Sequence, residues 1–219
     1  MLRIISTSDG SSTIYVPELD EHYHSTFGAI NESLHVFINE GYKSIYADPV
    51  SVFEMGFGTG LNTLLTLYES LKDKRRVDYV SVEKYPLSEN IYQKLNYDTF
   101  FPEHKKGYFK LLHQCPWEEE CRISDNFMLL KIGTDFLNMT ADRLFDLVYY
   151  DAFAPGKQAE MWSFNTISKA ASMIKPGGVF VTYSAKGQLK RDLNNLGFNV
   201  EHRMGPAGKR QITRAVKKR

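Results

Sequence analysis

One stretch decides the fold of this chain: Val52-Phe53-Glu54-Met55-Gly56-Phe57-Gly58-Thr59-Gly60-Leu61. Its apolar first half is typical of a buried strand, and three glycines then alternate through a tight turn. A helical pattern starts directly afterwards, so the free N–H groups and the positive end of that helix face the turn. The stretch therefore predicts a nucleotide-cofactor site; the alternative is a glycine-rich turn without a ligand.

The spacing of the glycines indicates which cofactor. A dinucleotide fingerprint has a third glycine where this chain has Leu61, which argues against a nicotinamide-dependent oxidoreductase. E-x-G-x-G-x-G after a first strand instead resembles the motif of class I S-adenosylmethionine (SAM) methyltransferases. The cofactor-binding candidates at this loop are Glu54, Gly56, Phe57, Gly58, Thr59, Gly60 and Asn62.

Composition and length set the broad class. The chain has 219 residues, of which 42% are apolar and 24% charged, so we expect one globular domain over 1–219. No signal peptide or membrane span is read, and Cys115 and Cys121 form no zinc pattern. We therefore expect a cytoplasmic protein with no membrane partner and no metal.

The net charge is only +1, but the basic residues gather at the C-terminal end. This end is either a footprint for a phosphate backbone or a solvated tail. Its basic residues are Lys186, Lys190, Arg191, Arg203, Lys209, Arg210, Arg214, Lys217, Lys218 and Arg219.

Strands that alternate with helices predict an α/β fold. We expect a Rossmann-like, mostly parallel seven-stranded sheet with helices on both faces. Helices are expected over 28–41, 61–76 and 86–97, and another is expected to start at Met161-Trp162. Residues 1–27 are expected to form a hairpin extension, and residues 98–125 an irregular elaboration. His22 and His24 have no apparent third metal ligand, so we expect them to line a cleft or pack beneath it.

Four carboxylates follow predicted strands: Glu54, Glu83, Asp135 and Asp151. Ligands bind at the carboxyl ends of strands in such sheets. Glu83, which precedes Lys84, stands where a carboxylate accepts ribose hydroxyls in nucleotide-binding folds. The alternative is that Glu83 is an ordinary surface residue. Asp135 is the candidate for the adenine amino group, or else the N-cap of the next helix.

A second motif, Asp151-Ala152-Phe153-Ala154-Pro155-Gly156-Lys157, follows the fourth strand. Asp151 would lie near the transferred methyl group, with Phe153 and Pro155 as a rigid apolar wall. An acceptor amine must lose a proton before it attacks, and a carboxylate can hold it and help that proton leave. The alternative for Asp151 is a helix N-cap.

Together these motifs resemble the methyltransferase domain of the MnmC family. The resemblance includes Glu32-Ser33-Leu34-His35-Val36-Phe37, Val82-Glu83-Lys84-Tyr85-Pro86-Leu87, Met161-Trp162 and Gly208-Lys209-Arg210. It implies SAM-dependent methylation of the aminomethyl group on the wobble uridine of tRNA, with the acceptor at the Asp151 turn. The wobble base would have to leave the anticodon loop stack.

Two departures from the family pattern affect these expectations. MnmC carries a fused FAD-dependent oxidase, which this sequence does not contain, so we expect methylation only, with a separate oxidase as a possible partner. Gly133-Thr134-Asp135 replaces Gly-Asp, which shifts the adenine contact by one position. Candidate RNA contacts are Lys157, Lys209, Arg210 and Trp162. The alternative for Trp162 is a residue of the core.

Two other functions stay open at this point. An aminopropyltransferase of the spermidine-synthase type shares the fold and the amine acceptor. A non-catalytic RNA-binding or partner subunit would keep the fold for stability alone, but the retained glycine loop and Asp151 argue against it.

Overall fold

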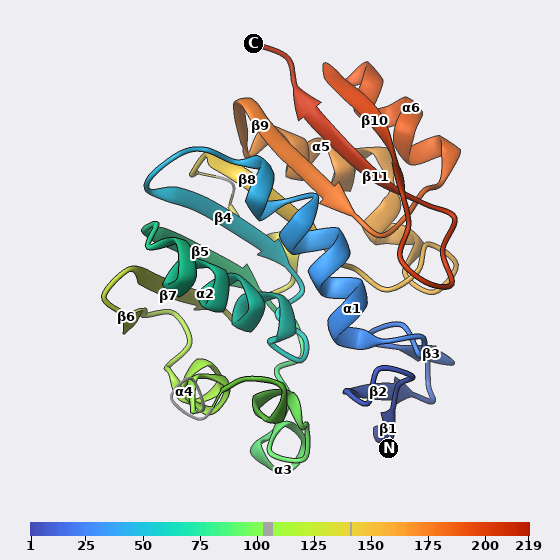
Figure 1. Cartoon of the computed structure of the whole chain (residues 1–219). Coiled ribbons are helices and arrows are strands. Elements are labelled where there is room, and N and C mark those ends of the chain that lie inside the picture. The colour runs from blue at the N-terminus through green and yellow to red at the C-terminus, as the bar shows by residue number, and fades with distance from the viewer. Residues whose placement is uncertain (103–106, 141) are drawn as a thin grey trace.

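The computed structural model describes residues 1–102, 107–140 and 142–219. Within these residues, eight strands form the main sheet in the order β10-β11-β9-β8-β4-β5-β7-β6 (Figure 1). They are β4 (Val50–Met55), β5 (Val77–Val82), β6 (Glu120–Ser124), β7 (Phe127–Ile132), β8 (Phe145–Tyr150), β9 (Ile174–Thr182), β10 (Phe198–Met204) and β11 (Gln211–Lys217).

The centre of this sheet is parallel, as expected, because β9, β8, β4, β5 and β7 are linked by parallel pairings. β11, β10 and β6 are antiparallel additions at the edges. The prediction of seven strands was wrong, because β6 lies inside the segment expected to be irregular. Only Ile123 of β6 is buried, so this edge strand lacks the apolar pattern that predicts a strand.

Helices cover both faces of the sheet (Figure 1). On one face lie α1 (Ala29–Ser33), the π-helical turn Leu34–Asn39 that continues it, α2 (Leu61–Asp73) and α4 (Tyr108–Gln114). On the other face lie α5 (Phe164–Ser172) and α6 (Gly187–Asn195). Each face has its own cluster of buried apolar side chains. The central strands are consequently buried on both sides, as all six residues of β4 are.

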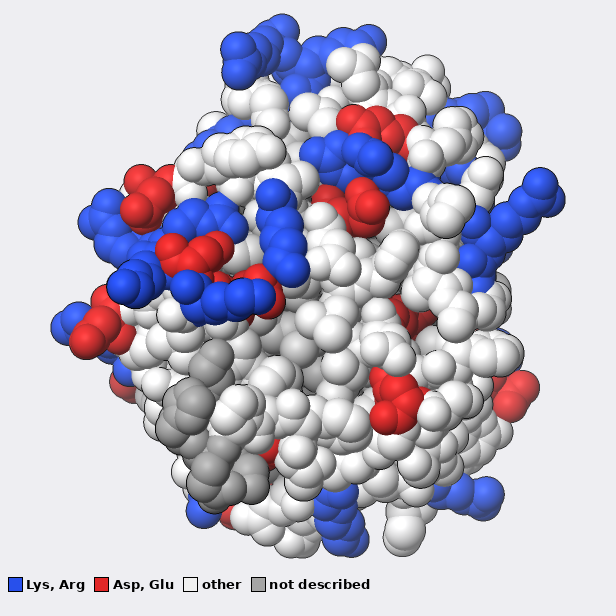
Figure 2. Space-filling model, in the orientation of Figure 1, with Lys and Arg blue, Asp and Glu red and all other residues white. Residues whose placement is uncertain are grey.

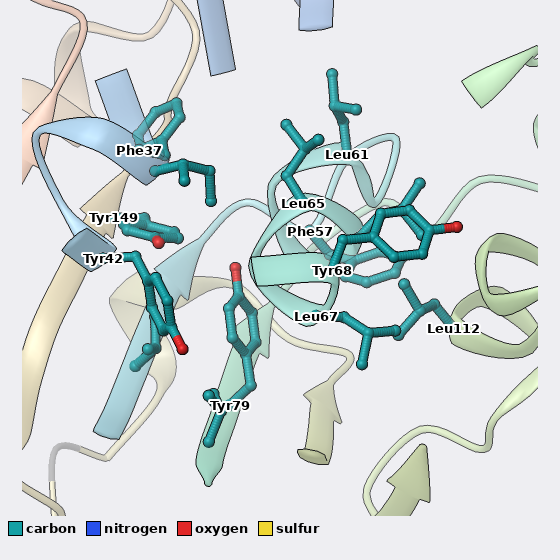
Figure 3. Close-up of a cluster of buried hydrophobic side chains, with 14 of the residues drawn as sticks. Phe37, Tyr42, Phe57, Leu61, Leu65, Leu67, Tyr68, Tyr79, Leu112 and Tyr149 are labelled. Atoms are coloured by element: carbon teal, nitrogen blue, oxygen red, sulfur yellow. The ribbon is translucent and has the colours of Figure 1, made fainter. Parts of the chain in front are cut away.

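The larger apolar cluster fixes α2 and α4 over the sheet. Figure 3 shows Tyr79 of β5 beneath α2, Tyr149 of β8 beside Phe37, and Leu112 of α4 beside Leu67 of α2. Because α2 starts directly after the glycine loop, this packing also holds the loop in place.

The N-terminal hairpin is present and gains a third strand. β1 (Arg3–Ser6) pairs with β2 (Ser12–Val16), which pairs with the two-residue β3 (Glu21–His22). Figure 1 shows this small sheet beyond the ends to which the central strands point. The N-terminal extension thereby covers the edge of the main sheet where ligands bind in such folds.

Two predicted helices are shorter than expected. Residues 86–97 contain only the four-residue α3 (Glu89–Tyr92), because Tyr92 and Leu95 alone supply buried anchors before Tyr97. Trp162 ends a 3₁₀ turn, and α5 starts at Phe164, where Ser163 caps it by accepting the Thr166 backbone N–H. The described parts of the segment 98–125, residues 98–102 and 107–125, contain α4 and β6 and are therefore partly regular, and residues 103–106 lie outside the described residues.

Candidate active site

A cleft of about 770 Å³ opens at the carboxyl ends of β4, β5 and β8, beneath the N-terminal sheet. It brings together most of the site residues predicted from the sequence. Those that line it are Gly56, Phe57, Gly58, Thr59, Asn62, Glu83, Lys84, Asp135, Asp151, Phe153, Lys157 and Lys209. Glu54, Gly60, Pro155, Trp162 and Arg210 do not line it.

The glycine loop forms the floor of the cleft, and its backbone explains its composition. Gly56, Gly58 and Gly60 have φ values of +94°, +51° and +74°, a region that side chains other than glycine rarely adopt. A Cβ on Gly58 would lie 3.1 Å from the ring of Tyr23, and one on Gly56 would lie 3.1 Å from the Asp151 carbonyl oxygen. The glycines therefore allow close approach of both the N-terminal extension and the Asp151 turn.

Two histidines, buried His24 and half-buried His113, contact Thr59 of this loop. His24 Nε2 lies 2.6 Å from Thr59 Oγ1, and His113 Nε2 donates to the Thr59 carbonyl over 3.1 Å. Burial lowers the pKa of each imidazole to about 4, so both are neutral near pH 7. His22 and His24 line the cleft as expected, whereas the sequence did not single out His113.

Glu83 and Asp135 stand on the cofactor side of the cleft. Glu83 Oε2 accepts the Gly58 N–H over 2.9 Å, and its Oε1 accepts the Tyr85 N–H over 2.8 Å. The Asp135 carboxylate forms an ion pair with Lys84 Nζ over 2.8 Å and accepts the Leu137 N–H over 2.9 Å. The hydrogen bond from Lys84 lowers the pKa of Asp135. Asp135 is thus the N-cap of a 3₁₀ turn, as the alternative expected, and it also lines the cleft. Its contact with adenine stays a prediction.

Asp151 occupies the end of β8, where its carboxylate Oδ2 accepts from Asn62 Nδ2 over 2.8 Å. Burial raises the pKa of this carboxyl to about 7, against the lowering effect of the Asn62 hydrogen bond. The alternative of a helix N-cap is wrong, because Ser163 caps α5.

The turn after Asp151 is held by its own neighbours. Phe153 lies edge-on to Tyr23 at 5.0 Å between ring centres, which joins the turn to the N-terminal extension. Trp162 Nε1 donates to the Phe153 carbonyl over 2.8 Å, and the Gln158 side chain accepts the Phe153 N–H. Trp162 is therefore a support behind the turn, and the apolar wall consists of Phe153 without Pro155.

Glu54 lies below the cleft and not in it. Its Oε2 accepts from Thr63 of α2 over 2.9 Å and from Ser81 of β5 over 2.8 Å, so it ties α2 to the sheet. The residue is fully buried, which raises the pKa of its carboxyl to about 8. The expectation that Glu54 contacts the cofactor is corrected: strand pleating points its side chain into the protein.

The wall opposite the glycine loop carries residues whose pairing the sequence does not reveal. Lys209 forms an ion pair with buried Glu32 of α1, and its ammonium lies 4.0 Å from the centre of the Tyr183 ring. The Tyr183 hydroxyl donates to the Ala152 carbonyl over 2.7 Å. Lys209, expected as a phosphate contact, thus has its charge balanced inside the cleft. Glu32 and Tyr183 lie far apart in sequence, and only the fold joins them.

The cationic candidates near the mouth of the cleft differ in their surroundings. Lys157 lines the cleft, and its Nζ lies 3.5 Å from the Asp20 carboxylate. Arg210 is exposed and lines an adjoining hollow with Tyr183, Ser184, Ala185, Lys209 and Gln211.

Residues 1–102, 107–140 and 142–219 contain neither a cluster of metal ligands nor a helix suited to a membrane. No group of three or more His, Cys, Asp or Glu side chains in these ranges could hold a metal ion. None of the helices there has both the length and the apolar character needed to cross a membrane.

This chain is similar in sequence to known proteins over most of its length. It is 30% identical to the bifunctional tRNA 5-methylaminomethyl-2-thiouridine biosynthesis protein MnmC of Cupriavidus necator, over 91% of this chain and 32% of that protein. The MnmC of Legionella pneumophila (strain Corby) is 31% identical, over 90% of this chain and 34% of that protein. The chain thus spans about one third of the length of these relatives.

A solved structure and a family model agree with this likeness. The crystal structure of MNMC2 from Aquifex aeolicus superposes with a TM-score of 0.81 at 28% identity, covering 98% of this chain and 70% of that one. The model of a family described as S-adenosyl-L-methionine-dependent methyltransferase matches residues 109–218, half of the chain, including β8 and the Asp151 turn. This chain therefore belongs to that family of S-adenosyl-L-methionine-dependent methyltransferases.

Proposed function

We propose that this protein methylates the amine of 5-aminomethyluridine, or of its 2-thio derivative, at the wobble position of tRNA. The observation that carries the proposal is the position of Asp151, a carboxylate in the cleft beside the glycine loop and the Phe153 wall. The names of its MnmC relatives place them in the biosynthesis of 5-methylaminomethyl-2-thiouridine in tRNA.

The shape and polarity of the cleft fit SAM. Gly56 and Gly58, the two positive-φ glycines that line the cleft, place no side chain between the loop backbone and a ligand. Glu83, at the end of β5, would accept the ribose hydroxyls, and Asp135, with Lys84, would meet the adenine. Thr59 and Asn62 would lie on the methionine side, while Glu54 and Gly60 support the loop from outside the cleft.

When bound, SAM supplies a sulfonium-activated methyl group that a nitrogen in line with the sulfur can take. This chain's residues hold the acceptor: the Asp151 carboxylate accepts N–H bonds from the amine and takes up the proton that the amine loses. A carboxyl with a pKa of about 7 suits this role, because it can both bind and release that proton near neutral pH. Asn62 fixes the carboxylate, and Phe153 limits the positions that the acceptor can take.

The acceptor base must be unstacked from the anticodon loop to reach the cleft. Lys157 and Arg210 are the proposed phosphate contacts, at the mouth of the cleft and in the hollow beside it. Figure 2 shows basic side chains at the edge of the view where Figure 1 places the β10–β11 hairpin. A tRNA substrate also implies a cytoplasmic protein, and a separate FAD-dependent oxidase is a proposed source of that substrate.

The test is incubation with SAM and tRNA that carries 5-aminomethyluridine, followed by mass spectrometry of the wobble nucleoside. The proposal expects the nucleoside to gain one methyl group. Transfer of an aminopropyl group from decarboxylated SAM to a diamine, with no methylation of tRNA, would indicate an aminopropyltransferase instead. Failure to bind SAM in calorimetry would indicate a non-catalytic subunit.

A further inference from the structure

The cleft contains, beside the Asp151 turn, an ion pair of half-buried Lys209 and buried Glu32 that the proposed mechanism does not use. Lys209 reaches in from the β10–β11 hairpin, and its side chain is 30% exposed. Its ammonium contacts both the carboxylate of Glu32 and the face of the Tyr183 ring. Glu32 is held in turn by the Ser25 N–H, which it accepts over 2.8 Å through its other oxygen.

The Lys209–Glu32 pair is linked to the Asp151 turn through Tyr183. The Tyr183 hydroxyl donates to the carbonyl of Ala152, which directly follows Asp151. Glu32, Asp151, Tyr183 and Lys209 all line the same cleft. A charge inside such a partly desolvated site acts on its neighbours far more strongly than it would in water.

The other titratable groups around Lys209 come from the N-terminal extension and from Tyr183, which follows β9. His24 is neutral near pH 7, since burial lowers its pKa to about 4. Tyr23 and Tyr183 are also neutral, because burial raises the pKa of each phenol. Glu21 also lines the cleft, and its negative charge adds to the rise in the pKa of Tyr183. Among the charged residues that neighbour Asp151 and Tyr183 here, Lys209 is therefore the cation, and Glu32 and Glu21 are the anions.

We propose that the Lys209 ammonium favours the neutral acceptor amine and the Asp151 carboxylate at the acceptor end of the cleft, the part that Asp151, Tyr183, Glu32 and Lys209 line. Glu32 has the opposite electrostatic effect and holds Lys209 in place. The proposal rests on the proposed function, because it concerns an amine acceptor. An ammonium repels a second ammonium, so Lys209 favours the neutral amine, which alone has the electron pair that forms the new N–C bond.

The signs of the two charges give a paired test. In Lys209→Met the ascending limb of the pH profile of kcat/KM for the aminomethyl tRNA is expected to move up by about one pH unit. In Glu32→Gln it is expected to move down, because Lys209 then acts unopposed while the amide oxygen can still accept from Ser25. Lys209→Arg keeps the charge and is expected to keep the wild-type profile.

The control is Lys72→Met, on the exposed end of α2, which is expected to leave the profile unchanged. The proposal is overturned if the profiles of Lys209→Met and Lys209→Arg coincide, or if Glu32→Gln moves in the same direction as Lys209→Met.

A second measurement needs neither SAM nor RNA. Difference infrared spectroscopy of the free protein follows the ionisation of the Asp151 carboxyl, which is assigned by its loss in Asp151→Asn. We expect its pKa to rise in Lys209→Met and to fall in Glu32→Gln, and an unmoved carboxyl in both variants overturns the electrostatic role. If wild-type protein does not methylate the tRNA but the carboxyl shifts as expected, the proposed function fails and the electrostatic role stands.

Discussion

At the scale of single residues, Asp151 combines burial with one hydrogen-bond donor. Burial alone would keep the carboxyl protonated, and the Asn62 amide partly offsets this by stabilising the anion. We expect Asp151→Asn to lower the single-turnover rate of methyl transfer by about 10²–10⁴, the usual contribution of an acid–base group. SAM affinity should stay within about threefold of wild type in calorimetry.

The matched control for that substitution is Asp125→Asn, in the exposed turn between β6 and β7. It removes the same charge far from the cleft and is expected to keep the wild-type rate. A fully active Asp151→Asn protein that binds SAM normally would remove Asp151 from the mechanism.

Gly58 tests the cofactor loop. Gly58→Ala places a Cβ on a residue with φ of +51° and 3.1 Å from the Tyr23 ring, so we expect SAM affinity to fall by about tenfold, as 1–2 kcal/mol of strain implies. Gly156→Ala is the control, because among the described residues nothing lies within 4 Å of its added Cβ. Equal SAM affinities for the two variants would contradict the assignment of this loop.

Residues at strand ends could be predicted from the sequence, whereas residues joined only by tertiary structure could not. Glu83, Asp135 and Asp151 were predicted because parallel strands deliver their ends to one edge of a sheet. Glu32 lies 177 positions from Lys209, and no periodicity links them. Glu54 was misplaced by one step of the strand pleat, which decides whether a side chain faces the cleft or the interior.

At the scale of elements, two additions to the central fold converge on the cofactor loop. His24 follows β3 of the N-terminal sheet, and His113 belongs to α4, in the segment 98–125. The sequence predicted the N-terminal hairpin but not α4 or β6, because α4 is only seven residues long and β6 has a single buried residue, so neither shows a clear period. These segments are therefore supports of the site as well as coverings.

The role of α4 can be tested through its histidine. His113→Phe keeps the aromatic contacts with Tyr92 and Phe57 but leaves the Thr59 carbonyl without its donor. We expect SAM affinity to fall by about tenfold, because a buried acceptor left unpaired costs about 1–3 kcal/mol. His202→Phe, on exposed β10, should bind SAM as wild type does. Unchanged binding by His113→Phe would show that α4 only covers the sheet.

At the scale of the whole molecule, buried Glu54 makes stability depend on pH. Its carboxyl titrates near 8 in the folded protein and near 4.5 when unfolded, so the native state keeps a proton that the unfolded state has lost. This contribution is complete below about pH 4.5 and is lost as pH rises towards 8. It declines by at most about 1.4 kcal/mol per pH unit.

Glu54→Gln removes this titration. Its free energy of unfolding, measured with urea from pH 5.5 to 7.5, should therefore rise relative to that of wild type as pH rises. Glu119→Gln, on the exposed turn before β6, should run parallel to wild type. A Glu54→Gln curve parallel to wild type would show that Glu54 is ionised in the folded protein.

The most direct test of the whole account is a crystal structure of the protein with S-adenosylhomocysteine. The account predicts the ligand along the glycine loop, its ribose at Glu83, its adenine near Asp135 and its sulfur facing the Asp151 end of the cleft. A ligand bound elsewhere, or a sulfur directed away from Asp151, would contradict it.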